Sequence, residues 1–69
     1  FMNIPPISFI DKDSGDEGVV LVRVSGDAVG LAVSLRKNGD VEVFLGAEEL
    51  DRLIRVLEDA RRVLRAKIP

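Results

Sequence analysis

The sequence predicts an α+β domain: a three- to four-stranded antiparallel β-meander followed by one long C-terminal amphipathic helix packed on one face of the sheet. Two stretches of alternating apolar residues flank a Gly-Asp pair, which is typical of a β-hairpin, and a third stretch follows an Asn-Gly pair. In the last third of the chain, apolar residues recur every three or four positions, as on one face of a helix. We therefore expect one domain over residues 1–69, with the sheet in 7–45 and the helix in 47–66.

The first expected strand is short and lies at an edge of the sheet. Pro5 and Pro6 lack the N–H groups that a central strand needs, so only residues 7–10 are expected to pair. The polar segment 11–18 that follows is rich in turn-forming Asp, Ser and Gly. Its start is similar to a calcium-binding EF-hand loop, but Asp16 and Val22 occupy the positions that require Gly and Glu. We expect a solvated turn there and no metal site.

The first hairpin joins residues 19–25 to residues 28–36 through a two-residue turn. Gly26 stands at the first central position of this turn, as a type II′ turn requires. The resulting register places three apolar pairs on one face of the sheet: Val24 with Val29, Val22 with Leu31, and Val20 with Val33. A slip of one residue would mix the two faces, so the pattern favours this register.

The second hairpin is expected to use Lys37, Asn38 and Gly39 as a three-residue loop, with Gly39 in the left-handed conformation. The apolar face then gains three further pairs: Leu35 with Val41, Val33 with Val43, and Leu31 with Leu45. On the opposite face, the same register sets Phe44 against Ala32. Both hairpins therefore direct the same residues of the middle strand towards the core.

The C-terminal helix carries an apolar stripe that is wider than a small sheet needs. The stripe consists of Leu50, Leu53, Ile54, Leu57, Ala60 and Leu64. We expect the sheet to cover Leu50, Leu53, Leu57 and Ala60. The apolar residues that the sheet does not account for lie on the flank of the stripe or in the last turns: Val56, Val63, Leu64 and Ile68. We expect these four residues to form a homodimer interface.

The composition argues against an enzyme and against a membrane protein. The chain has no histidine and no cysteine, which removes the commonest general base, the commonest metal ligand and the thiolate nucleophile. We therefore expect no catalytic residues, no metal and no cofactor. No apolar run approaches the roughly 18 residues of a membrane span, and no signal peptide is visible, so we expect a cytoplasmic protein. Arginine outnumbers lysine and glutamine is absent, which favours a thermophilic source.

The second face of the expected sheet is the best candidate for a binding site. It carries Arg23, Ser34, Arg36 and Phe44 around a middle strand of small side chains. Single-stranded DNA or RNA binds such faces, because an aromatic ring stacks on a base and arginine contacts phosphate. The alternative is a homodimeric structural or protein-interaction module without nucleic-acid binding. In that case we expect Phe44 and Leu21 to pack on another subunit or on the N-terminal segment, where Phe9 or Ile10 would fold over them.

The strand order resembles that of two groups of single-stranded-DNA-binding proteins. In this chain, antiparallel strands run through a short turn into the helical segment GAEELDRLIRVLEDA, residues 46–60. This pattern resembles the positive-cofactor-four coactivator fold and the archaeal single-stranded-DNA-binding proteins of the Thermoproteales type. The resemblance implies dimerisation through the helix and binding of DNA on the sheet side.

Overall fold

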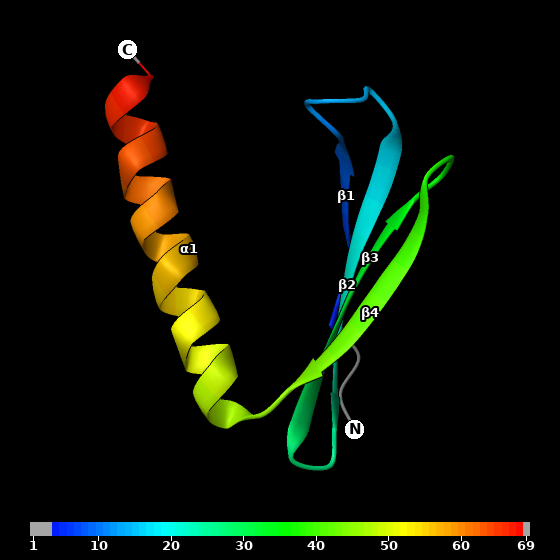
Figure 1. Cartoon of the computed structure of the whole chain (residues 1–69), viewed down its shortest axis with the longest axis vertical. Coiled ribbons are helices and arrows are strands. Elements are labelled where there is room, and N and C mark those ends of the chain that lie inside the picture. The colour runs from blue at the N-terminus through cyan, green and yellow to red at the C-terminus, as the bar shows by residue number, and fades with distance from the viewer. Residues whose placement is uncertain (1–3, 69) are drawn as a thin grey trace.

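The computed structural model describes residues 4–68, which form four β-strands and one α-helix (Figure 1). The elements are β1 (Ile7–Ile10), β2 (Glu17–Ser25), β3 (Ala28–Leu35), β4 (Gly39–Leu45) and α1 (Ala47–Lys67). The strands form one antiparallel sheet in the order β1-β2-β3-β4, so each strand pairs with its neighbours in sequence. The predicted α+β arrangement is confirmed, and α1 ends one residue later than predicted.

The β2–β3 hairpin has the predicted register. Val24 pairs with Val29 and Val20 with Val33 across the two strands. Gly26 has a φ of +61°, and no residue other than glycine has a positive φ within residues 4–68. Only the first central residue of the turn is therefore left-handed, which is the type II′ geometry predicted from Gly26-Asp27.

The first strand joins the sheet as an edge strand. Ile7 pairs with Val20, and Ile10 pairs with Glu17. The loop between β1 and β2 closes on itself, because the Asp11 N–H donates to the Asp16 carbonyl oxygen at 2.8 Å. The two prolines precede the strand, where their missing N–H groups cost the sheet no hydrogen bond.

The predicted register of the β3–β4 hairpin is wrong by two residues. Gly39 pairs with Leu35, so Val41 lies opposite Val33. Gly39 is left-handed as predicted, with a φ of +90°, but it begins β4 instead of ending the loop. The turn is held from outside by the Asp16 carboxylate, a long-range contact that local turn rules do not contain. Because the shift is even, every side chain stays on its predicted face.

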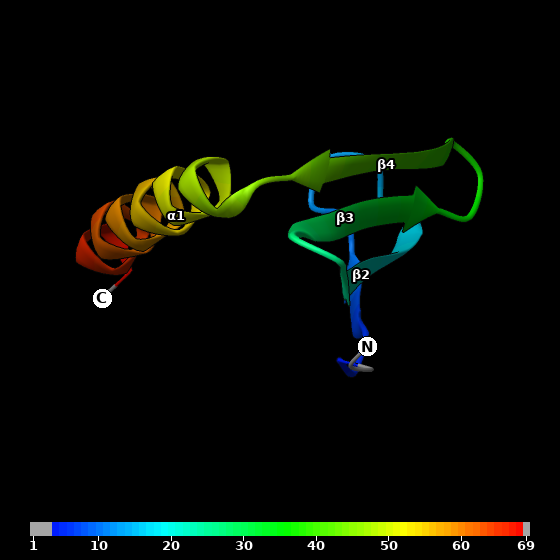
Figure 2. The same ribbon diagram turned by 90° about the horizontal axis from the view of Figure 1, so that it is seen from below.

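The helix diverges from the sheet after its first turns. Gly46, in extended conformation, alone joins β4 to α1, and Figures 1 and 2 show the helix and the sheet separating from this point. Among the described residues, α1 contacts only β3 and β4, and Leu50 and Leu53 are the only helix side chains that are not exposed. The expectation that the sheet covers Leu57 and Ala60 is wrong, because the helix starts at the end of an edge strand and then runs away from the sheet.

The single chain is consequently open. No hydrophobic side chain within residues 4–68 is fully buried, and the accessible surface is 5871 Å². A compact monomer of 7.5 kDa exposes about 4,200 Å². The radius of gyration is 13.8 Å, whereas a compact chain of this length has about 11 Å. The excess surface is therefore about 1,600 Å² per chain by this scaling, and much of it belongs to apolar side chains.

Candidate interaction surfaces

Arg23, Gly30 and Phe44 form a cluster on the polar face of the sheet, which is the face opposite the paired valines and leucines. Gly30 pairs with both Arg23 and Phe44, which places the three residues in one cross-strand row. A Cβ at the buried Gly30 would lie 2.9 Å from Phe44 Cε2 and 3.2 Å from Arg23 Cγ. The Phe44 ring and the aliphatic part of Arg23 therefore fill the space above this glycine. The Arg23 guanidinium lies 5.6 Å from the ring centroid, within cation–π range.

The cluster differs from the expectation because of the register of β4. The sequence placed Phe44 opposite Ala32, whereas the structure places it opposite Gly30 and beside Arg23. Phe44 keeps 53% of its surface exposed. It therefore presents part of its ring to solvent while the rest covers the glycine.

Both candidate arginines are paired with carboxylates. Arg23 Nη2 lies 3.0 Å from Glu42 Oε2, and Arg36 Nη1 lies 3.0 Å from Glu17 Oε2. All four side chains are more than one-third exposed, so each ion pair contributes little to stability, about 0–1 kcal/mol. Their effect on recognition is larger, because each carboxylate offsets the positive charge of the guanidinium that a phosphate would contact.

The Ser34 side chain also has a hydrogen-bond partner on the same face. Its hydroxyl donates a short hydrogen bond of 2.5 Å to Asp40 Oδ1. The ionisable side chains on this face are two arginines and three acids: Arg23, Arg36, Glu17, Asp40 and Glu42. The face therefore carries a net negative charge, which does not attract a polyanion at long range.

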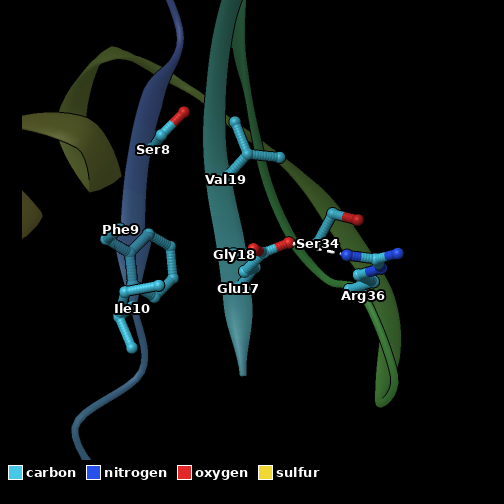
Figure 3. Close-up of a pocket in the computed structure, with 8 residues that line it drawn as sticks. All are labelled: Ser8, Phe9, Ile10, Glu17, Gly18, Val19, Ser34 and Arg36. Atoms are coloured by element: carbon cyan, nitrogen blue, oxygen red, sulfur yellow. Dashed lines mark hydrogen bonds and ion pairs between the residues drawn. The ribbon is translucent and has the colours of Figure 1, made fainter. Parts of the chain in front are cut away.

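The structure divides the four predicted site residues between two open depressions. Ser34 and Arg36 line a depression of about 530 Å³ that extends across β2 to Phe9 and Ile10 of β1 (Figure 3). Arg23 and Phe44 line a smaller one of about 260 Å³ near the β2–β3 turn. Phe9 and Ile10 were not among the predicted nucleic-acid-binding residues, although residues 7–10 were expected to pair at the edge of the sheet.

The four predicted dimer residues are all exposed, three of them on α1 and the fourth directly after its last residue. They are Val56, Val63, Leu64 and Ile68. Ile54 and Leu57, which belong to the apolar stripe, are exposed as well. The exposed apolar surface of the helix is therefore broader than predicted and extends from the third turn to the last.

The apolar face of the sheet is open at its edges, which sequence reasoning missed. Ile7 on β1 and Val41 and Val43 on β4 are all exposed. The alternation pattern correctly assigned Val41 and Val43 to the apolar face, but it contained no information on whether the helix reaches them. The sheet face and the helix stripe together form one candidate protein-binding surface.

The described part of the chain contains neither a metal-binding cluster nor a membrane-spanning helix. Residues 4–68 contain no group of three or more acidic, histidine or cysteine side chains placed to hold a metal ion. Within the same residues, no helix combines the length and apolar character needed to cross a bilayer. Comparison with protein families, curated proteins and solved structures gave no match.

Proposed function

We propose that this chain is a protein-interaction module whose hydrophobic core is completed by another polypeptide chain. The observation that carries the proposal is the absence of any fully buried hydrophobic side chain within residues 4–68, together with the exposed apolar surfaces of sheet and helix. A partner that covers both surfaces would give the helix stripe the packing that its own sheet does not provide.

The magnitude of the exposed surface favours a partner over a solitary chain. If half of the excess surface of about 1,600 Å² is apolar, its burial is worth about 20 kcal/mol at about 25 cal/mol per Å², before the costs of association. The net stability of an ordinary domain is about 5–15 kcal/mol. A chain that leaves this surface in water therefore lacks a burial free energy at least as large as the net stability expected of the whole domain.

The test measures mass and folding together over a dilution series. Multi-angle light scattering gives the mass of the native chain, and circular dichroism gives its melting temperature at the same concentrations. We expect a mass above 7.5 kDa and a melting temperature that falls on dilution, because association stabilises the folded state by mass action. A 7.5 kDa species that melts cooperatively at a concentration-independent temperature contradicts the proposal.

A second candidate function is the binding of single-stranded nucleic acid on the polar face. It is favoured by the half-exposed Phe44 ring beside Arg23, an arrangement on which a base can stack. The carboxylate partners of Arg23 and Arg36 oppose it, so this candidate ranks second.

Fluorescence anisotropy with labelled 20-nucleotide DNA and RNA tests this second candidate. Phe44→Ala is expected to weaken binding by about 1–3 kcal/mol, the range for one base–aromatic stack. Val43→Ala is the matched control, because it lies on the same strand and opposite face. Binding that is undetectable, or that does not respond to salt, rejects nucleic acid as the ligand.

A further inference from the structure

Exposure of apolar side chains rises along both β4 and α1 with distance from their junction at Gly46. On β4, Leu45 is half-buried, Val43 is 45% exposed and Val41 is 59% exposed. On α1, Leu50 and Leu53 are half-buried, whereas the next apolar residues of the stripe are all exposed. The two elements therefore pack together at the junction and leave their far ends uncovered (Figure 1).

The far part of the helix matches the dimensions of the sheet it would need to cover. From Ile54 onwards, α1 continues for about 14 residues, or about 21 Å at 1.5 Å per residue. Strands β2 to β4 have seven to nine residues, and at about 3.3 Å per residue they span about 23–30 Å. One chain thus supplies both a protruding apolar helix and an open apolar sheet of similar length.

Because one chain carries both surfaces, a second copy of the chain is the partner best suited to cover them. In a two-fold dimer, each helix can cover the other chain while its own chain is covered in return. A standard stable interface buries about 800 Å² on each partner. The excess surface of about 1,600 Å² per chain provides twice that area.

The charges along the helix favour one direction of pairing. The first two turns contain three acids and one arginine: Glu48, Glu49, Asp51 and Arg52. The last two turns contain four basic residues and no acid: Arg61, Arg62, Arg65 and Lys67. Antiparallel helices would place each acidic end beside a basic end, whereas parallel helices would place like charges together.

The leucine spacing fits the same direction. Leu50, Leu57 and Leu64 follow one another at intervals of seven residues, so they lie on one side of the helix. Leu57 stands at the midpoint of α1. In an antiparallel pair with its two-fold axis near Leu57, Leu50 of one helix lies close to Leu64 of the other.

We propose that the partner of this chain is a second copy and that the two α1 helices lie antiparallel. The C-terminal half of each helix then covers the exposed apolar surface of the other chain. This inference rests on the proposed interaction function, and it adds the identity of the partner and the direction of the helices. Val56 and Val63 flank the leucine side and widen the contact.

Cross-linking of single-cysteine variants tests the direction, because residues 1–69 contain no cysteine. Leu50→Cys, Leu57→Cys and Leu64→Cys are treated with a short bis-maleimide, whose span tolerates small changes of register. We expect the Leu57→Cys variant to form cross-linked dimers without a second variant present. We expect Leu50→Cys and Leu64→Cys to cross-link at least 10-fold more when refolded together than when either is alone. Ala66→Cys is the control, because it lies about 200° around the helix from Leu64.

The alternative outcomes separate the two proposals. Efficient cross-linking of Leu64→Cys with itself would show parallel helices and overturn the inference. Dimer mass without cross-linking of any leucine variant would overturn it as well, while the proposed interaction function would stand. A cooperatively folded 7.5 kDa chain would overturn both.

A second measurement avoids substitutions in the leucine side. Spin labels on Ala66→Cys should lie at least about 27 Å apart in the antiparallel pair, because each label is nine residues from the midpoint. In a parallel pair the two labels have no offset along the helix axis, so only the widths and spacing of the two helices and the tethers separate them. Pulsed electron paramagnetic resonance distinguishes the two distances, and a short distance contradicts the inference.

Discussion

The carboxylate of Asp16 accepts a hydrogen bond from the backbone N–H of Lys37 at 2.8 Å, which ties the β1–β2 loop to the β3–β4 turn. The same oxygen accepts a longer bond of 3.3 Å from Asn38 Nδ2. Asp16 is the only buried charged side chain within residues 4–68. One carboxylate thus joins two loops that are 21 residues apart in the sequence.

Removal of this carboxylate should destabilise the sheet. Asp16→Ala leaves the Lys37 N–H without its partner, and hydrogen bonds to charged groups contribute about 1.5–3 kcal/mol. We expect the free energy of unfolding, measured by urea denaturation, to fall by that amount. Asp16→Asn keeps an acceptor oxygen and should lose less than half as much. Equal losses for the two variants would show that the bond to Lys37 is not the source of the effect.

The Asp16 contact also explains why sequence rules succeeded for one hairpin and failed for the other. The β2–β3 register depends on Gly26 and on local alternation, both of which are visible in the sequence. The β3–β4 register depends in addition on a carboxylate from a distant loop. The face of each side chain was nevertheless predictable, because an error of two residues preserves alternation.

The candidate surfaces were predictable only in part for the same reason. The alternation pattern placed Arg23 and Phe44 on one face, but the proximity of Phe44 to Gly30 required the true register. The exposure of Leu57 required the direction in which the helix leaves Gly46. That direction is set by backbone geometry at a single residue, and hydrophobic periodicity contains no information on it.

The loop that contains Asp11 should show a measurable shift in titration. A hydrogen bond from the Ser14 hydroxyl, at 2.6 Å, is the main cause that lowers the pKa of the Asp11 carboxyl below its ordinary value of 3.8. The backbone N–H groups of Ser14 and Asp13 add to the effect. Ser14→Ala should therefore raise this pKa towards 3.8, as measured by carbon-detected NMR of the carboxyl group.

The sign of the accompanying pH dependence follows from the direction of the shift. Because the folded-state pKa is the lower one, Asp11 stabilises the fold at pH values above its unfolded-state pKa, near 3.8. This contribution is lost as the pH falls from there through the folded-state pKa. The Ser14→Ala variant should show a smaller loss of stability over the same acidic range. An unchanged Asp11 pKa in the variant would contradict the assignment.

The packing of Phe44 over Gly30 should appear as coupling between the two positions. Gly30→Ala places a methyl group within 2.9 Å of the ring, which must then move. We expect a loss of about 1–2 kcal/mol, towards the low end for overpacked sites. In a Phe44→Ala background the same change should be neutral or stabilising, because alanine suits a strand better than glycine. Equal effects in both backgrounds, measured by urea denaturation, would show that the ring does not constrain Gly30.

Charge placed on the leucine side of α1 should dissociate the chain, whereas the same charge on the far side should not. Leu64→Glu and Ala66→Glu each add one negative charge near the same helix end, so their effects on the helix dipole are similar. Only Leu64 lies in line with Leu50 and Leu57. Losing a buried leucine and burying a carboxylate in a two-fold interface affects both copies at once.

We therefore expect Leu64→Glu to weaken self-association at least 100-fold, which is about 2.7 kcal/mol. Ala66→Glu should change it less than threefold. Sedimentation velocity over a dilution series gives both dissociation constants, and circular dichroism gives the helical content of each variant. If the two variants associate equally well, the leucine side of α1 is not the contact surface, and the antiparallel helix pair is rejected.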